Sequence, residues 1–204
     1  MEDATSVLTT SFLVGTNVYL PGPSAEDSEK ISQIKTLERL ILSIASVQYG
    51  VAWKIEDRGT LMRWRSLDWI LTTPMLLKTF HSLAEEKGFT GSFVPVFFLD
   101  ILMIYTGYHA EFITQTEQEK WSWYMLGMAC LLGIFYYVYQ WDTYLRDVGV
   151  DTKNLATFFY VGWTAYGANF MNPDPELRQV GFNVLDLVNK GLYSLQLNSV
   201  LNEL

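Results

Sequence analysis

Two ionisable residues stand four positions apart in an apolar stretch near the end of the chain. They are Asp186 and Lys190, within the run LDLVNKG. On an α-helix this spacing puts both side chains on one face, about one turn apart. A lysine in apolar surroundings loses its proton, and the neutral amine is a nucleophile that forms a Schiff base with an aldehyde. The pair therefore indicates either Schiff-base chemistry or a structural ion pair, and the two residues alone do not separate these possibilities.

A second polar group lies in another apolar stretch, where Arg65 precedes Asp68 by three residues. That spacing also places both side chains on one helix face. A protonated Schiff base needs a carboxylate beside it, and Asp68 and Asp186 are the candidates for this counter-ion. A third stretch carries Trp163, Tyr166 and Phe170 on one helix face. Such a face is common in ordinary packing, but with a buried lysine it predicts a slot for a long conjugated aldehyde.

These residues belong to seven apolar segments, each close to the roughly 20 residues that a bilayer-spanning helix needs. The segments cover about 4–20, 30–54, 60–84, 91–112, 120–141, 153–171 and 176–201. Several of them hold an isolated ionisable residue, whereas a soluble amphipathic helix has a whole face of charges. The sequence therefore predicts an all-α fold, a seven-transmembrane-helix bundle that forms a single domain over residues 1–204. The alternative is a soluble, all-helical protein.

Composition supports a membrane protein and excludes several functional classes. Half of the 204 residues are hydrophobic, 18% are charged, and the formal net charge is -8. Because no basic stripe is present to meet phosphates, we expect no nucleic-acid partner. We predict the lipid bilayer as a partner, and we predict no metal site. No motif for an open catalytic cleft or a phosphate-binding loop is visible, so we expect no enzymatic activity.

Four motifs occur in an order that points to one family. They are RSLDWILTTPMLL at 65–77, DILMIYTG at 100–107, GWTAYG at 162–167 and LDLVNKG at 185–191. They resemble helices three, four, six and seven of the microbial (type 1) rhodopsins, and the resemblance covers about two-thirds of the chain. The short chain and short first helix are similar to the rhodopsins of giant algal viruses.

The resemblance implies all-trans retinal as the cofactor, held on Lys190 as a Schiff base inside the bundle. It implies that Asp68 is the primary counter-ion and proton acceptor and that Asp186 is the second counter-ion. Arg65 would lie just outside these carboxylates, and Thr72 would hydrogen-bond Asp68. Tyr49 matches a tyrosine near the counter-ions.

The resemblance also implies the lining of an internal retinal pocket. Two tryptophans, Trp69 and Trp163, would stand on either side of the polyene. The other lining residues that it implies are Thr73, Leu76, Met103, Gly107, Tyr124, Tyr166 and Phe170.

Two positions bear on the path of an ion. Thr79 stands eleven residues after Asp68, where outward proton pumps often carry a carboxylate. Glu38 lies in the half of the second segment that the family's topology places near Thr79. It is a candidate substitute proton donor, or a residue of a cation path as in channel-type rhodopsins. A third possibility is that Glu38 pairs with Arg39 or Lys35 at the membrane edge.

The function that we predict is that of a light-driven outward proton pump. The alternatives are a light-gated cation channel and a photosensory receptor, so protons or cations are the expected transported partners. A Schiff-base enzyme and a chromophore-free membrane scaffold are rivals that would lack visible colour with retinal. From the resemblance we expect a multi-pass membrane protein with its N-terminus outside and its C-terminus cytoplasmic. A homo-oligomer, either a pentamer or a trimer, is also expected.

Overall fold

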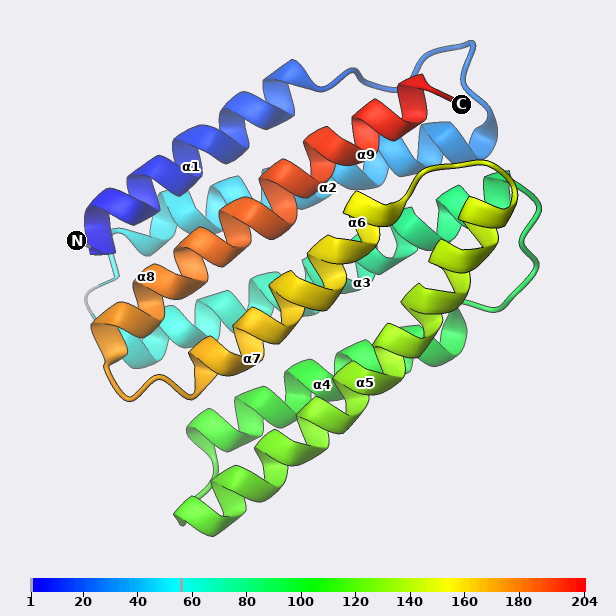
Figure 1. Ribbon diagram of the computed structural model, residues 1–204. Coiled ribbons are helices and arrows are strands. Elements are labelled where there is room, and N and C mark those ends of the chain that lie inside the picture. Colours follow the sequence, from blue (N-terminus) through cyan, green and yellow to red (C-terminus); the bar gives the residue numbers. More distant parts are fainter. Residues whose placement is uncertain (1, 56) are drawn as a thin grey trace.

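The computed structural model describes residues 2–55 and 57–204, and these residues form helices with no β-strand among them. The helices run as seven rods packed side by side, and the two ends of the chain lie at opposite ends of the bundle (Figure 1). The predicted all-α seven-helix bundle is therefore confirmed.

The first five rods are single helices. They are α1 (Glu2–Tyr19), α2 (Glu29–Ala52), α3 (Arg58–Glu86), α4 (Val94–Phe112) and α5 (Glu117–Asp147). The side chains of Ser28, Asp57 and Thr116 cap the first turns of α2, α3 and α5 by accepting hydrogen bonds from backbone N–H groups. Such caps fix where a helix begins. The observed α5 is longer at both ends than the predicted segment 120–141.

The last two rods each change their winding near the middle. The sixth rod consists of α6 (Lys153–Thr157), a π-helical turn η1 (Phe158–Trp163) and α7 (Thr164–Phe170). The seventh consists of α8 (Pro175–Asp186), a π-helical turn η2 (Leu187–Leu192) and α9 (Tyr193–Asn202). π-Helical turns are rare and often lie at functional sites. Here η2 contains Lys190, and the sequence patterns did not predict either turn.

The two π-helical turns approach each other closely because one of them carries a glycine. A Cβ atom on Gly162 would overlap Oδ1 of Asn189. The Asn189 side chain is held in place, since its Nδ2 donates to the carbonyl oxygen of Leu185 at 2.9 Å. Gly162 thus permits the sixth and seventh rods to meet one residue away from Lys190.

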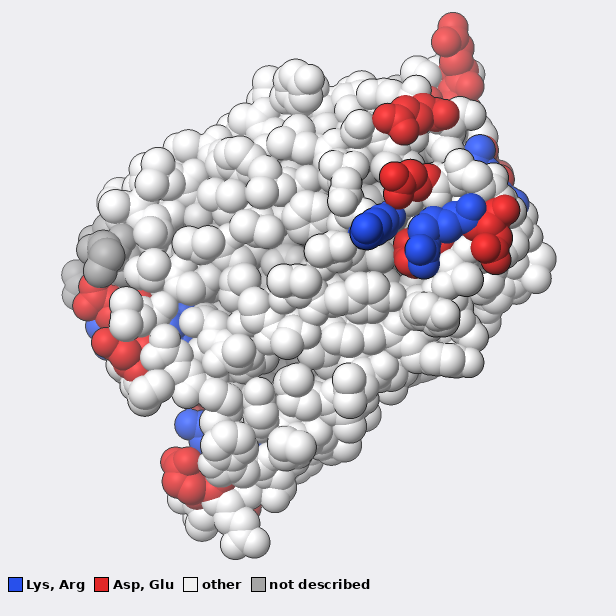
Figure 2. Space-filling model, in the orientation of Figure 1, with Lys and Arg blue, Asp and Glu red and all other residues white. Residues whose placement is uncertain are grey.

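The distribution of charge matches a protein that crosses a bilayer. Figure 2 shows Lys, Arg, Asp and Glu gathered at the two ends of the bundle, with a broad uncharged band between them on the face in view. By length and apolar composition alone, α5 is the one helix of the described chain that meets the requirement for a membrane span. Helices such as α2 and α3 carry charged residues that are buried in the bundle, including Glu38, Arg65 and Asp68. Ionisable side chains inside a membrane protein are expected to face the interior in this way.

The close approach at Gly162 generates a prediction about stability. Gly162→Ala should destabilise the bundle by about 1–3 kcal/mol, because the added methyl group displaces Asn189 and separates the two rods. The measurement is the midpoint of thermal unfolding in detergent. Gly50→Ala is the matched control, since a Cβ there meets no atom within 4 Å. Equal midpoints for the two variants would show that the contact at Gly162 is not tight.

Candidate functional site

The site is centred on the ammonium group of Lys190, whose side chain is 1% exposed. It points from η2 at two carboxylates on different rods. Nζ of Lys190 donates a short hydrogen bond to Oδ2 of Asp68 on α3 and lies 3.7 Å from Oδ1 of Asp186. The structure therefore brings together the lysine and the two carboxylates that were singled out from the sequence.

Asp186 has hydrogen-bond donors at both of its oxygens. Oδ2 accepts from the hydroxyl of Tyr49 at 2.5 Å and from Nη1 of Arg65 at 3.2 Å. Oδ1 accepts from Nε1 of Trp69 at 3.2 Å and from the hydroxyl of Tyr166. Donors of this number stabilise the ionised form of a buried carboxylate. Tyr49, placed near the counter-ions by resemblance alone, is thus in direct contact with one of them.

Asp68 is bonded much less completely. Its Oδ2 contacts Lys190, whereas its Oδ1 has no hydrogen-bond partner among the described residues. The resemblance implies a hydrogen bond between Thr72 and Asp68, and the structure contains one. The Thr72 hydroxyl donates to the backbone carbonyl oxygen of Asp68 at 2.9 Å rather than to its carboxylate. A threonine inside a helix commonly bonds the carbonyl four residues earlier, and this local partner outcompetes the carboxylate.

Arg65 lies on the other side of Asp186 and is 1% exposed. Besides Asp186, its Nη1 donates to the Tyr49 hydroxyl at 2.6 Å. Its Nη2 donates to Oε1 of Gln179 at 3.2 Å and to Oδ1 of Asn183 at 2.7 Å. These two amides were not predicted. A signal for them existed, because positions 179, 183, 186 and 190 recur at helical spacing on one face of the seventh rod.

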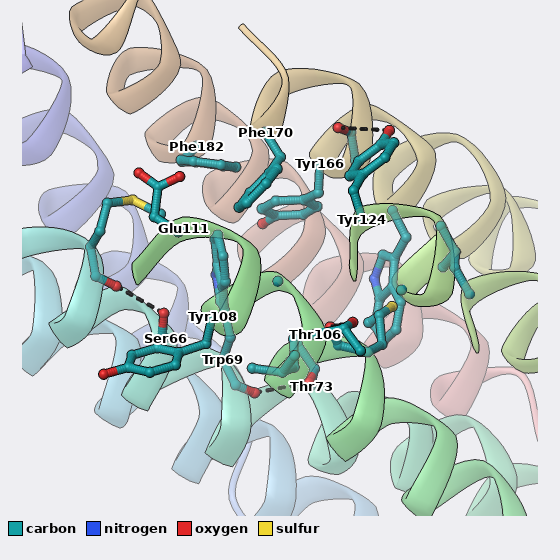
Figure 3. Close-up of a pocket in the computed structure, with 18 of the residues that line it drawn as sticks. Ser66, Trp69, Thr73, Thr106, Tyr108, Glu111, Tyr124, Tyr166, Phe170 and Phe182 are labelled. Atoms are coloured by element: carbon teal, nitrogen blue, oxygen red, sulfur yellow. Dashed lines mark hydrogen bonds between the residues drawn. The ribbon is translucent and has the colours of Figure 1, made fainter. Parts of the chain in front are cut away.

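A cavity of about 130 Å³ extends away from Lys190, with walls that are mostly apolar and aromatic. Figure 3 shows Trp69, Thr73, Tyr124, Tyr166 and Phe170 among its lining side chains. All ten residues predicted for the retinal pocket line this cavity, namely Trp69, Thr73, Leu76, Met103, Gly107, Tyr124, Trp163, Tyr166, Phe170 and Lys190. Thr106, Gly127 and Phe182 also line it and were not predicted.

The cavity suits a flat, apolar molecule attached to the lysine. A Cβ atom on Gly107 would meet nothing within 4 Å, so the absence of a side chain leaves open space at this wall. Tyr124 and Phe170 stack with ring centroids 6.2 Å apart, and Trp69 and Tyr166 meet edge to face at 5.5 Å. Rigid aromatic walls and a single terminal amine are the features that a covalently bound polyene aldehyde requires.

Glu38 lies on α2, on the side of Lys190 away from Arg65, and it is close to α9. It is 3% exposed, and the hydroxyl of Ser194 donates a short hydrogen bond to its Oε2. The hydroxyl of Thr79 lies close to Glu38 and also 3.0 Å from the hydroxyl of Tyr193. Thr79 and Glu38 therefore lie near each other, and their partners Tyr193 and Ser194 are about one turn after Lys190 on the seventh rod.

Of the three possibilities considered for Glu38, its pairing with Arg39 or Lys35 is the one that the structure contradicts. Nζ of Lys35 bonds Oδ1 of Asp27 at 2.7 Å, and Nη2 of Arg39 donates to the carbonyl oxygen of Leu20 at 3.0 Å. Both cations face the loop between α1 and α2, whereas the Glu38 side chain faces the bundle interior. Oε1 of Glu38 has no hydrogen-bond partner in the described structure.

Comparison with known proteins identifies relatives over most of the chain. The model of the bacteriorhodopsin-like protein family matches residues 4–203. The chain is 29% identical over 153 residues to halorhodopsin of Natronomonas pharaonis, a match that covers 70% of this chain and 52% of that protein. It is 32% identical over 111 residues to archaerhodopsin-3 of Halorubrum sodomense, covering 50% of this chain and 40% of that protein. The chain thus spans about half the length of the curated relatives that it matches.

Solved structures share the fold at lower sequence identity. A light-driven proton pump, LR (Mac) from Leptosphaeria maculans, superposes with a TM-score of 0.81 at 19% identity, covering 100% of this chain and 96% of that one. Viral rhodopsin OLPVRII superposes with a TM-score of 0.78 at 22% identity, covering 99% and 98%. At these sequence identities the structural similarity establishes only the shared seven-helix fold.

The resemblance seen in the motifs is therefore confirmed. Bacteriorhodopsin-like proteins are multi-pass membrane proteins that bind retinal covalently through a lysine. With a family match over residues 4–203 and the same seven-rod bundle, this chain belongs to the bacteriorhodopsin-like protein family.

Proposed function

We propose that this protein is a light-driven pump that moves protons outward, with retinal attached to Nζ of Lys190. The observation that carries the proposal is the unequal bonding of the two carboxylates around this lysine. Asp186 is held by Tyr49, Arg65 and two further donors, whereas one oxygen of Asp68 lacks a partner among the described residues. A proton that leaves Lys190 therefore has an available acceptor on one side.

The direction of transfer follows from the free energies of the two carboxylates. When bound, retinal supplies the absorption of light and an isomerisation that re-aims the proton on Nζ of Lys190. Asp186 is stabilised as an anion by its donors, so protonating it would sacrifice several charge-assisted hydrogen bonds. Asp68 loses only its contact with Lys190, and that contact weakens once the lysine nitrogen is neutral. The proton accordingly moves from Lys190 to Asp68.

A pump must return a proton to Lys190 from the opposite side. Glu38 supports this step, because it is a buried carboxyl group on the side of Lys190 away from Arg65. The hydroxyls of Ser194, Tyr193 and Thr79 lie beside it. Thr79 has no acidic proton, so Glu38 acts as the donor that returns a proton to Lys190. We also propose that the N-terminus lies outside and that the protein assembles as a pentamer or trimer.

A light-gated cation channel is the second candidate function. A small cavity of about 10 Å³ adjoins Glu38 and is lined also by Leu20, Pro21, Lys35 and Ser194. A carboxylate beside an opening is a typical feature of a cation path. In a channel Glu38 would attract cations, whereas in the pump it gives up a proton.

The photocurrent of the retinal-reconstituted protein distinguishes the two functions. In a voltage-clamped membrane scanned through zero potential, we expect an outward current that keeps its sign, since a pump is driven by light rather than by the gradient. Asp68→Asn should abolish this current and shift the absorbance to the red, because the counter-ion charge is lost. A current that reverses at the equilibrium potential of a cation would instead establish the channel.

The attachment of retinal to Lys190 is tested by removing the amine. Lys190→Ala should give protein without visible absorbance after incubation with retinal, because no other buried amine faces the cavity in the described structure. Lys54→Ala, at an exposed lysine at the end of α2, is the control and should colour normally. A coloured Lys190→Ala protein would disprove the assignment.

Glu38→Gln tests the donor. Glutamine keeps the size and the hydrogen bond with Ser194 but has no proton to give, so recovery of the Lys190 proton after a flash should slow by about tenfold or more. Flash spectroscopy measures this recovery directly. Glu29→Gln, at an exposed glutamate of the same helix, should leave the rate unchanged. If both variants recover at the original rate, Glu38 is not the donor.

A further inference from the structure

We propose that Gln179 and Asn183 are positioning residues that hold the Arg65 guanidinium toward Asp186 and away from Asp68. The inference rests on the proposed function, since it concerns how Asp68 remains able to accept a proton. Both amides are buried, with Gln179 2% and Asn183 1% exposed. Neither touches Lys190 or the two carboxylates in a hydrogen bond, so any influence on the site passes through Arg65.

The contacts of Arg65 show how its position is set. Nη1 faces inward to Tyr49 and Asp186, while Nη2 faces outward to the oxygens of Gln179 and Asn183. The shortest outward contact is 2.7 Å, to Oδ1 of Asn183. A buried guanidinium needs acceptors for its N–H groups, because an unpaired charged donor carries a large desolvation cost. The two amides provide the acceptors on the outward side.

Asn183 is itself held by α1, which fixes the direction of its oxygen. Its Nδ2 donates to the hydroxyls of Thr5 at 2.9 Å and Ser6 at 3.1 Å. The hydroxyl of Thr9 donates to the backbone carbonyl oxygen of Asn183 at 3.2 Å. With its amide nitrogen committed to α1, Asn183 presents Oδ1 to Arg65. The first helix thereby takes part in arranging the charges of the site.

Loss of these outward acceptors would redirect Arg65 toward Asp68. The two residues are three positions apart on α3, a spacing that allows their side chains to meet. Oδ1 of Asp68 lacks a partner in the described structure and is the acceptor in reach on the same helix. A guanidinium at that oxygen would stabilise the carboxylate and oppose its protonation. Gln179 and Asn183 therefore keep Asp68 open as an acceptor.

The other titratable groups near Asp68 are not hydrogen-bonded to the Asn183 side chain. Lys190 and Asp186 face Asp68 from the seventh rod, and the Tyr49 hydroxyl approaches from α2. None of these groups depends on Asn183 for its hydrogen bonds. A change in the protonation of Asp68 on replacing Asn183 would thus report the movement of Arg65.

The experiment is a pH titration of the absorbance of the retinal-loaded protein in the dark. Protonation of Asp68 shifts the absorbance to the red, and the midpoint of this shift measures its proton affinity. Asn183→Leu should lower the midpoint by about one pH unit, because Arg65 turns inward to Asp68. Asn183→Asp should raise it by about the same amount, because the new carboxylate draws Arg65 outward and offsets its charge.

Asn17 provides matched controls for both changes. It lies toward the surface of α1, where its Nδ2 donates to the hydroxyl of Ser43 at 2.9 Å. Asn17→Leu and Asn17→Asp should leave the midpoint where it is in the unchanged protein. Opposite shifts of the midpoint in the two Asn183 variants, with unchanged midpoints in the two Asn17 variants, would support the positioning role.

The outcomes that overturn the inference differ from those that overturn the pump. A midpoint that stays in place in both Asn183 variants, or that rises with Asn183→Leu, would show that the amides do not hold Arg65 off Asp68. If Asn183→Leu does not fold, Gln179→Leu removes the other outward acceptor of Arg65 without adding charge, and it should likewise lower the midpoint. An absence of visible absorbance in the unchanged protein, or a red shift that persists in Asp68→Asn, would instead contradict the proposed function.

Discussion

The ammonium group of Lys190 is buried in the middle of a helical bundle, and it requires negative charge beside it. Asp68 and Asp186 supply that charge from two different rods, so one interaction ties α3 to the seventh rod. Two carboxylates beside one cation leave an excess of negative charge, which Arg65 offsets from the far side of Asp186. The amides of Gln179 and Asn183 and the hydroxyl of Tyr49 then hold Arg65. The carboxylates, the arginine and the residues that hold it are therefore all needed because one lysine is buried.

The difference between the two carboxylates is what gives the site a direction. Asp186 is fixed by donors on three helices, which are Tyr49 on α2, Arg65 and Trp69 on α3, and Tyr166 on α7. Asp68 instead keeps one oxygen without a hydrogen-bond partner in the described structure. The lining of the cavity meets Lys190 at the level where the sixth and seventh rods change their winding. Gly162 allows those rods to approach, and its contact with Asn189 lies one residue away from Lys190. Glu38 completes the arrangement on the opposite side of the lysine.

Much of this could be predicted from the sequence, for physical reasons that are specific to membrane helices. Isolated ionisable residues in apolar stretches, such as Asp68 and Lys190, must face the interior, so their partners are restricted to one another. The details depended on competition between local and distant partners. Thr72 bonds its own helix, and Glu38 bonds Ser194 rather than the nearby cations. The π-helical turns could not be predicted from the sequence, because they depend on how closely the sixth and seventh rods approach each other.

Proton transfer from Lys190 to Asp68 is the central claim, and time-resolved infrared difference spectroscopy of the retinal-loaded protein tests it most directly. A protonated carboxyl group has a C=O stretch that a carboxylate lacks. The account predicts that this band appears after a flash in step with loss of the Lys190 proton, and that it is absent in Asp68→Asn. A band that persists in Asp68→Asn, or no such band in the unchanged protein, would contradict the account.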